Sequence, residues 1–307
     1  MLTDRPEHFV AWWERHRPPP DRPPVMRAAM LVSPVGFRVS EQSARDNRYM
    51  VPATPVDPER AIAQHLAVVR ALTERGLPVL EIPGRPGLDD AIYPNNVYAT
   101  IPGRFIVGRM RHPVRRREAE REDVRRLFVD TFRYTLCDLS REPDVIAELT
   151  GPLVIDRARG IGWCGMTGRV NEAGCRRMHE AFALRATLRF DLVPEEYHTN
   201  LVLAVLAGRG CVVHPGSIVH APAVLRALEA VYGERILRLT DEEKAAFCGN
   251  LIAVTERDVF LSATALAALR PASRATLERW GFTVHAVAID ELEKGGGSLR
   301  CLIAEVF

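Results

Sequence analysis

Apolar residues along this chain fall into short runs that alternate with turns and with longer helical stretches. Two short apolar runs separated by a turn read as a strand pair. Such pairs occur four times, at 97–100 with 105–107, 153–155 with 161–164, 201–204 with 211–213, and 251–254 with 259–261. Helical stretches follow, for example at 172–184, 221–232 and 271–280. The pattern predicts a repeated unit of two strands, a helix and a further strand.

The units recur with a nearly constant period. Their starting positions are spaced by 50 to 52 residues, at Asn96, Glu148, His198, Asn250 and Cys301. A fixed period of this length indicates a repeat architecture. We therefore predict an α/β fold with five ββαβ-type units closed into a ring, a five-bladed α/β propeller with pseudo-fivefold symmetry. The N-terminal strand at 28–32 is expected to complete the unit that contains the apolar segment 302–304.

The chain before this ring has a different composition. Residues 1–24 carry clustered prolines and the pair Trp12-Trp13. We expect a short helix followed by a Pro-rich arm there, and a single catalytic domain over 25–307. Trp12-Trp13 could cap the ring or form an interface between copies of the chain, and both alternatives, including a homo-oligomer, stay open.

If every unit starts its first strand near the ring's centre, the five starting residues converge on one pocket. A thiol, an imidazole and a carboxylate from Cys301, His198 and Glu148 would then meet in space. These are the groups of a nucleophile, its base and the residue that orients the base. A terminal cysteine that only fills the core is the plain alternative, because free cysteine is among the most buried residue types.

Composition narrows the class of partner. The chain has 47% hydrophobic and 26% charged residues and a net charge of +2, which gives no reason to expect a nucleic acid or a membrane. The six cysteines lie far apart and no signal-peptide pattern begins the chain, so we expect reduced thiols and a cytoplasmic location. The arginines between 109 and 126 alternate with acidic residues, which predicts a solvated helix face.

Four segments resemble those of the guanidino-group-modifying superfamily, whose fold is the pentein α/β propeller. They are Asp90-Ala91-Ile92-Tyr93-Pro94-Asn95-Asn96, Glu148-Leu149-Thr150-Gly151, His198-Thr199-Asn200, and the glycine-rich stretch from Gly295 to Cys301. The residues of these segments are most similar to those of the citrulline-utilisation hydrolase branch. The resemblance extends from about residue 28 to residue 307.

The resemblance implies a cysteine-dependent hydrolase that needs no metal or organic cofactor. It assigns Cys301 as nucleophile, His198 as general acid and base, and Glu148 as the group that orients His198. It also implies that Arg169, with Arg38 and Arg300 as rivals, binds the carboxylate of an amino-acid substrate. Together with the converging positions, it gives the expected substrate-binding set Asp90, Asn96, Asn200, Arg169 and Asn250.

Two positions differ from those of relatives that act on guanidinium. Carboxylates are usual there, whereas this chain has Asn96 and Asn200. An amide both donates and accepts hydrogen bonds, and a ureido group presents both a carbonyl oxygen and N–H groups. This favours a neutral ureido amino acid, with citrulline hydrolysed to ornithine as first candidate. Asp90 remains as one carboxylate that could bind guanidinium, and asparagine is also common at turns.

Other functions stay open on the sequence alone. Arginine deimination and amidino transfer use the same chemical groups. The same fold also occurs in a ribosome-binding translation factor without catalysis, although such a binding protein needs none of the three catalytic residue types. Residues 160–165 match the dinucleotide-binding motif Gly-x-Gly-x-x-Gly. They lie inside a predicted hairpin and not between a strand and a helix, so we do not interpret them as a dinucleotide site.

Overall fold

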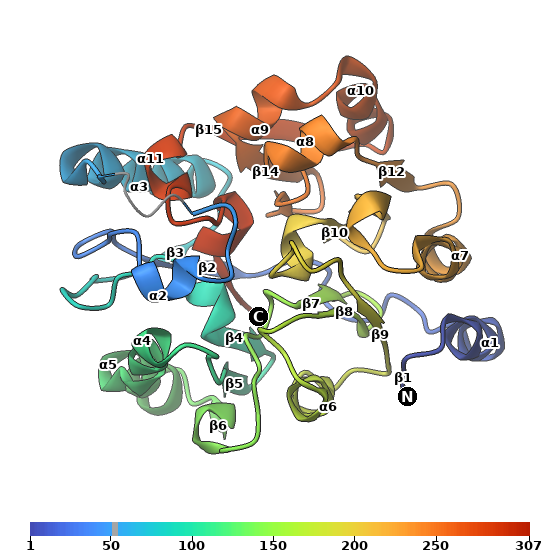
Figure 1. The fold of residues 1–307 in the computed structure, drawn as a ribbon, viewed down its shortest axis with the longest axis horizontal. Coiled ribbons are helices and arrows are strands. Elements are labelled where there is room, and N and C mark those ends of the chain that lie inside the picture. Colours follow the sequence, from blue (N-terminus) through green and yellow to red (C-terminus); the bar gives the residue numbers. More distant parts are fainter. Residues whose placement is uncertain (51–54) are drawn as a thin grey trace.

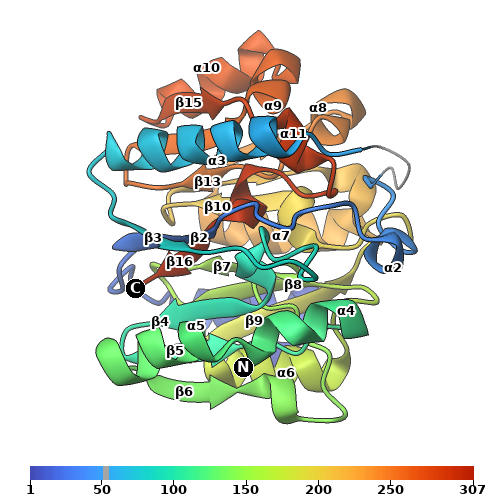
Figure 2. The same cartoon turned by 90° about the vertical axis from the view of Figure 1, so that its left-hand side faces the viewer.

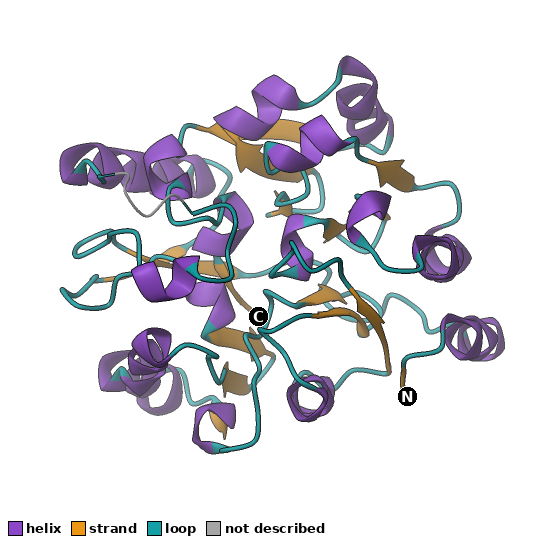
Figure 3. Cartoon of the chain, in the orientation of Figure 1, coloured by secondary structure: helices purple, strands orange, loops and turns teal. Residues whose placement is uncertain are grey.

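The computed structural model describes residues 1–50 and 55–307, which form five sheets arranged as a ring (Figure 1). Each sheet contains an antiparallel strand pair, and one strand of that pair also pairs in parallel with a third strand. Helices lie around the outside and strands lie toward the middle (Figure 3). The prediction of a five-bladed α/β propeller built from ββαβ units is therefore confirmed.

The first unit joins the two ends of the ring. Strand β16 (Ala304–Val306) pairs antiparallel with β2 (Ala28–Val32), and β2 pairs in parallel with β3 (Val79–Ile82). Helix α3 (Pro58–Thr73) connects β2 to β3 and lies along the outer side of the unit (Figure 2). The predicted partner of the N-terminal strand is thus correct, but its strand starts two residues later than expected. Residues Leu299–Leu302 form the 3₁₀-helix η7 instead.

The other four units repeat this order of elements. The second contains β4 (Tyr98–Ile101), β5 (Arg104–Val107), α4 (Pro113–Arg116), α5 (Glu122–Arg126) and β6 (Thr135–Asp138), and the third β7 (Leu153–Asp156), β8 (Ile161–Met166), α6 (Glu172–Ala181) and β9 (Ala186–Asp191). The fourth contains β10 (Leu203–Leu206), β11 (Gly210–Val213), α7 (Ala221–Tyr232) and β12 (Ile236–Arg238). The fifth contains β13 (Ile252–Ala253), β14 (Asp258–Ser262), α9 (Ala263–Ala268), α10 (Pro271–Arg279) and β15 (Thr283–Val287). Short helices α2 (Glu41–Ala44), α8 (Asp241–Ala245) and α11 (Asp290–Glu293) lie in the connections.

Local sequence explains the turns and the helix starts. Three hairpins turn at Gly103, Gly160 and Gly208, whose φ angles of 73°, 66° and 64° are left-handed and favour glycine. Helix α3 begins at Asp57, whose carboxylate accepts hydrogen bonds from two backbone N–H groups of the first turn. The side chain of Asn171 starts α6 in the same way. Such local signals at the turns and helix starts account for the regular period.

The N-terminal segment packs on the ring. Strand β1 (Leu2–Thr3) pairs in parallel with β9, and α1 (Pro6–His16) lies beside α7. Phe9 on α1 is fully buried, with its ring 5.0 Å from that of Trp163. The expected short helix is therefore present, and the domain boundary at residue 24 stays a prediction.

Candidate active site

The five predicted positions lie in short turns that precede the first strand of each unit. Asn96 ends the 3₁₀-helix η1 (Pro94–Asn96), His198 precedes η5 (Thr199–Leu201), and Cys301 lies within η7. Glu148 and Asn250 lie just before β7 and β13. All five side chains are buried. The turns, rather than the strand ends that the sequence suggested, hold the candidate groups.

The thiol of Cys301 is surrounded by amide groups from two other units. Asn250 Nδ2 donates to Cys301 Sγ over 3.3 Å and also to the backbone oxygen of Asn200 over 2.9 Å. Asn200 Nδ2 lies 3.8 Å from the same sulfur. Burial raises the pKa of Cys301, and the hydrogen bond from Asn250 opposes part of that rise. The two asparagines, expected to bind substrate, therefore also lie against the sulfur, and the hydrogen bond from Asn250 favours its thiolate form.

His198 and Glu148 form a buried pair. His198 Nε2 lies 2.9 Å from Glu148 Oε2, and both side chains are fully buried. Burial lowers the pKa of His198 to about 4, although the hydrogen bond and charge of Glu148 act in the opposite direction. The imidazole is therefore neutral at neutral pH, with Nε2–H donating to the carboxylate. Because the other nitrogen, Nδ1, has no hydrogen-bond partner within the described residues, it is free to act as a base.

Glu148 is held as a carboxylate by several donors. Arg169 Nη1 lies 3.2 Å from Glu148 Oε2, and the backbone N–H of Arg111 donates to Oε1 over 3.1 Å. Burial alone would raise the pKa of Glu148, but the charge of Arg169 and the hydrogen bond from His198 outweigh it, so this pKa lies well below its ordinary value. The carboxylate therefore stays ionised and fixes which nitrogen of His198 carries the proton.

Arg169, expected to bind a substrate carboxylate, contacts two carboxylates of the protein itself. Its guanidinium is 2% exposed and donates to Glu148, to the carboxylate of Asp46 and to the backbone oxygen of Ser43. The rivals are engaged as well, because Arg38 pairs with Asp89 and Arg300 pairs with Glu305. In this structure Arg169 supports Glu148, and its assignment to a substrate carboxylate stays a prediction.

Several oxygens near these groups lack hydrogen-bond donors. Among the residues that the structure describes, the unpartnered buried acceptors at the strand starts are Oδ1 of Asp90, Asn95, Asn96 and Asn250. Asp90 is 3% exposed, and burial raises its pKa despite the nearby charge of Arg115 and a hydrogen bond from Ser43. A buried acceptor without a donor costs free energy. The site is thus suited to a ligand rich in N–H groups.

Glycine keeps the base and one of these acceptors close together. A Cβ on Gly151 would lie 2.7 Å from His198 Nε2 and 2.8 Å from Asn96 Oδ1. Distances below about 3 Å do not occur for real Cβ atoms, so only glycine fits between the two side chains. The acidic-Gly segment recognised in the sequence therefore serves packing at the site.

Residues 40–50 cover the site from the first unit. Asp46 contacts Arg169, Arg111 and His112, and Tyr49 donates to Glu196 over 2.7 Å. These contacts bridge to the second, third and fourth units. Cys301 itself is 1% exposed.

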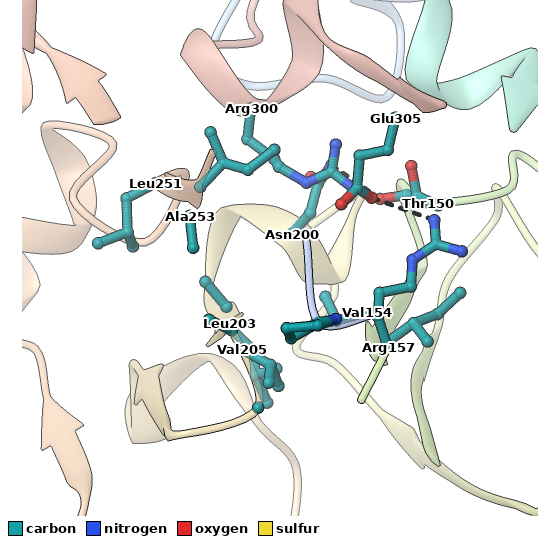
Figure 4. Close-up of a pocket in the computed structure, with 16 residues that line it drawn as sticks. Thr150, Val154, Arg157, Asn200, Leu203, Val205, Leu251, Ala253, Arg300 and Glu305 are labelled. Atoms are coloured by element: carbon teal, nitrogen blue, oxygen red, sulfur yellow. Dashed lines mark hydrogen bonds and ion pairs between the residues drawn. The ribbon is translucent and has the colours of Figure 1, made fainter. Parts of the chain in front are cut away.

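A small cavity lies on the other side of Asn200 (Figure 4). Its volume is about 40 Å³, enough for water, and its lining includes Thr150, Asn200 and Arg300. Glu305 accepts from Arg157 over 3.1 Å and from Arg300 over 2.9 Å at this cavity. Arg300, which is adjacent to Cys301 in sequence, pairs with Glu305, and its charge also opposes part of the rise in the pKa of Cys301.

The arginines of 109–126 differ from the solvated face that the sequence suggested. Arg115, Arg121 and Arg125 are all less than 9% exposed. Arg115 pairs with Glu118 over 2.8 Å and donates to the backbone oxygens of Asp90 and Tyr93. Alternating charges can also arise from buried pairs, and nothing in the local pattern distinguishes the two cases. Arg115 and Asp46 are thus residues near the site that sequence reasoning missed.

The described residues show no grouping of three His, Cys, Asp or Glu side chains suited to a metal ion. Across the same residues, no helix has the length and apolar character needed to cross a bilayer.

The pKa values predict how the thiol reacts with an alkylating agent. Because burial raises the pKa of Cys301 and His198 is neutral, the free protein holds a thiol and not a thiolate–imidazolium pair at neutral pH. The rate of Cys301 alkylation by iodoacetamide, followed by peptide mass spectrometry, should rise with pH beyond the ordinary thiol range. A rate plateau already present below neutral pH would show a preformed ion pair and contradict this expectation.

Comparison with known proteins adds independent information. A family model described as eukaryotic N,N-dimethylarginine dimethylhydrolase matches residues 33–307. An uncharacterised protein of Caenorhabditis elegans is 23% identical over 282 residues, which cover 91% of this chain and 93% of that protein. This extent agrees with the whole-chain resemblance seen in the sequence.

Solved structures share the fold at low identity. The N-terminal domain of ArgZ, an arginine dihydrolase of cyanobacteria, matches with a TM-score of 0.76 at 17% identity, over 91% of this chain and 97% of that one. A dimethylarginine dimethylaminohydrolase bound to S-methyl-L-thiocitrulline matches at 0.70 and 18%, over 92% and 100%. AgrE with L-arginine matches at 0.78 and 19%, over 91% of this chain and 40% of AgrE. They confirm the pentein fold, and the family model that matches residues 33–307 shows the family, while the citrulline-utilisation branch stays a prediction.

Proposed function

The chain belongs to the N,N-dimethylarginine dimethylhydrolase family, and we propose that it hydrolyses an arginine-type amino acid through a covalent intermediate on Cys301. It is a hydrolase of non-peptide C–N bonds in the guanidino-modifying superfamily. The observation that carries the proposal is the set of buried acceptors without donors in the described residues, led by Asp90 Oδ1. A guanidinium consists of N–H donors and a positive charge, and so matches both the acceptors and the carboxylate.

The same features support activation of the thiol by its substrate. A guanidinium bound beside Cys301 lowers the sulfur's pKa, because a nearby positive charge favours the thiolate. His198 Nδ1 accepts the thiol proton as the sulfur attacks the guanidinium carbon. The imidazolium, stabilised by Glu148, then protonates the leaving nitrogen, and ammonia departs. Neutral His198 next deprotonates a water that attacks the thio-intermediate, which releases the thiolate and the ureido product.

We also propose that the ureido product is a second substrate. Asn96 and Asn200 can each donate to a carbonyl oxygen as well as accept from N–H groups. A second round of thiolate attack on citrulline would release ammonia, then carbon dioxide and ornithine after hydrolysis. Overall, one arginine and two waters would give one ornithine, one carbon dioxide and two ammonia molecules. The similarity to ArgZ, which is an arginine dihydrolase, is consistent with this outcome.

A substitution of Asp90 should affect the reaction with arginine more than the reaction with citrulline. Replacing it by asparagine in Asp90→Asn removes the buried charge that pairs with a guanidinium but keeps an acceptor oxygen. We expect kcat/KM for arginine to fall by about 30-fold or more, since losing one partner of a buried charge pair costs at least about 2 kcal/mol. The value for citrulline should change much less. Steady-state assays on both substrates measure the difference.

Asp89→Asn is the matched control, because its carboxylate is adjacent in sequence but pairs with the exposed Arg38. It should leave both activities unchanged. Equal losses on arginine and citrulline in Asp90→Asn would show that the Asp90 charge does not select guanidinium.

The proposed function itself is tested with a panel of substrates. Purified protein is mixed with L-arginine, L-citrulline or N,N-dimethylarginine, and amine release and amino-acid products are followed by mass spectrometry. Ornithine and two ammonia molecules per arginine support both steps. Citrulline as the final product of arginine supports the first step only. Release of dimethylamine from dimethylarginine, with no reaction of the other two compounds, indicates that the methylated amino acid is the preferred substrate. Silence on all three compounds argues against the proposed substrate class.

A further inference from the structure

Two buried tyrosines contact the glycine-rich loop that leads to Cys301. Tyr93 donates from its hydroxyl to the backbone oxygen of Leu292 over 2.5 Å. Tyr197 donates to the backbone oxygen of Gly296 over 2.6 Å. One tyrosine comes from the turn before β4 and the other from the residue before His198. The segment 292–297 runs from the end of α11 through the glycines. It is thus hydrogen-bonded to two other units of the ring, at Leu292 before the glycines and at Gly296 among them.

The absence of a Cβ at two of the glycines leaves room for the side chain of Tyr93. A Cβ on Gly295 would lie 2.4 Å from the hydroxyl oxygen of Tyr93, and one on Gly297 would lie 2.9 Å from its ring. The same Cβ on Gly297 would lie 3.2 Å from Cys301 Sγ. Gly297 therefore brings the ring of Tyr93 close to the sulfur. The Gly-Gly-Gly sequence is explained by this close approach as well as by the φ of +77° at Gly296.

Tyr197 also contacts the base and its support. Its ring centroid lies 4.4 Å from that of His198, and the guanidinium carbon of Arg169 lies 5.3 Å from it. The pKa of Tyr197 is raised first by burial and then by the charge of a Cys301 thiolate, and the same two causes act on Tyr93. Both phenols thus lie close enough to the nucleophile to feel its charge.

We propose that Tyr93 and Tyr197 are positioning residues, which clamp the segment 292–297 so that Cys301 Sγ stays against the amide of Asn250. Neither needs to touch the reacting carbon, because each acts through the loop backbone. The inference rests on the proposed role of Cys301 as nucleophile. Removing a hydroxyl should let the loop shift, and a shift of about 1 Å at reacting atoms can cost about 10²-fold in rate.

The test compares Tyr197→Phe and Tyr93→Phe with Tyr134→Phe. Tyr134 also donates to a backbone oxygen, that of Phe307, but lies outside the site and loses the same kind of bond. We expect kcat to fall by about tenfold to a hundredfold in the two site variants with KM within about twofold, since the loss falls on alignment and not on binding. The control should keep the wild-type kcat.

A second readout needs no substrate. If the clamp holds the sulfur against Asn250, either site variant weakens that hydrogen bond and moves the pH profile of Cys301 alkylation to higher pH, while Tyr134→Phe leaves it in place. Thermal melts identify a purely structural role, in which all three variants lose similar stability. Unchanged alkylation profiles in both site variants would overturn the proposal. Shifted profiles in a protein that turns over none of the tested compounds would keep the clamp and reject the proposed function.

Discussion

Replacing Cys301 by alanine is expected to lower the turnover of arginine by about 10⁶-fold, the loss found when a covalent nucleophile is removed. The site offers no second thiol to replace it, since Asn250 and Asn200 are the side chains that contact the sulfur among the described residues. Fold and binding should survive, because alanine fits where the small Cys301 side chain is buried. Ammonia release under saturating substrate measures the loss.

Cys211→Ala provides the matched control. Cys211 is a fully buried thiol on β11, and its deletion should lower the free energy of unfolding by about 1 kcal/mol while leaving kcat unchanged. Retention of turnover in Cys301→Ala would show that the reaction proceeds without this nucleophile, whatever the substrate.

Replacing Glu148 by glutamine is expected to give the second-largest loss, up to about 10⁴-fold in kcat, as for other carboxylates that orient a catalytic histidine. An amide can donate to His198 Nε2 instead of accepting from it, which moves the ring proton to Nδ1 and removes the base from the site. The imidazolium that forms during the reaction also loses its counter-charge. The kcat of Glu148→Gln, with KM measured alongside, tests this.

Glu305→Gln is the comparison for the loss of a buried carboxylate. Glu305 pairs with Arg157 and Arg300 at the small cavity beside Asn200. The change should therefore lower the free energy of unfolding by about 3 kcal/mol but leave kcat nearly unchanged. Similar kcat values in the two variants would show that Glu148 acts on stability alone.

Much of the fold could be predicted from the sequence because its signals are local and repeated. Each hairpin has its own apolar runs and turn, and the nearly equal spacing of the five starting positions, from Asn96 to Cys301, indicated a closed ring. The ring then explained why residues far apart in sequence would meet. The pairing of β2 with the last strand, β16, followed from the same symmetry.

The parts that could not be predicted depend on three-dimensional neighbours. Arg169 and Arg115 look like any other arginine in a chain rich in this residue, and only the fold shows that Glu148 and Glu118 pair with them in the interior. The cover formed by residues 40–50 has no periodic signal. Asn200 and Asn250 were identified by position, but their contact with the Cys301 sulfur requires the turn geometry of η5 and η7.

The substrate inference changed for a physical reason. Asn96 and Asn200 alone suggested a neutral ureido group. The Asp90 carboxylate is buried, and one of its oxygens has no hydrogen-bond donor in the described part of the chain, so it favours a positively charged ligand. We therefore place guanidinium first and keep the ureido compound as a second substrate.

The most direct test of the central claim is the mass of the protein when arginine turnover is stopped with acid within the first cycle. We predict a species heavier by the mass of arginine less one ammonia, with the added group on the peptide that contains Cys301 and absent from Cys301→Ala. Turnover without any such species on Cys301, or with the group on another residue, would contradict the assignment of Cys301 as the nucleophile.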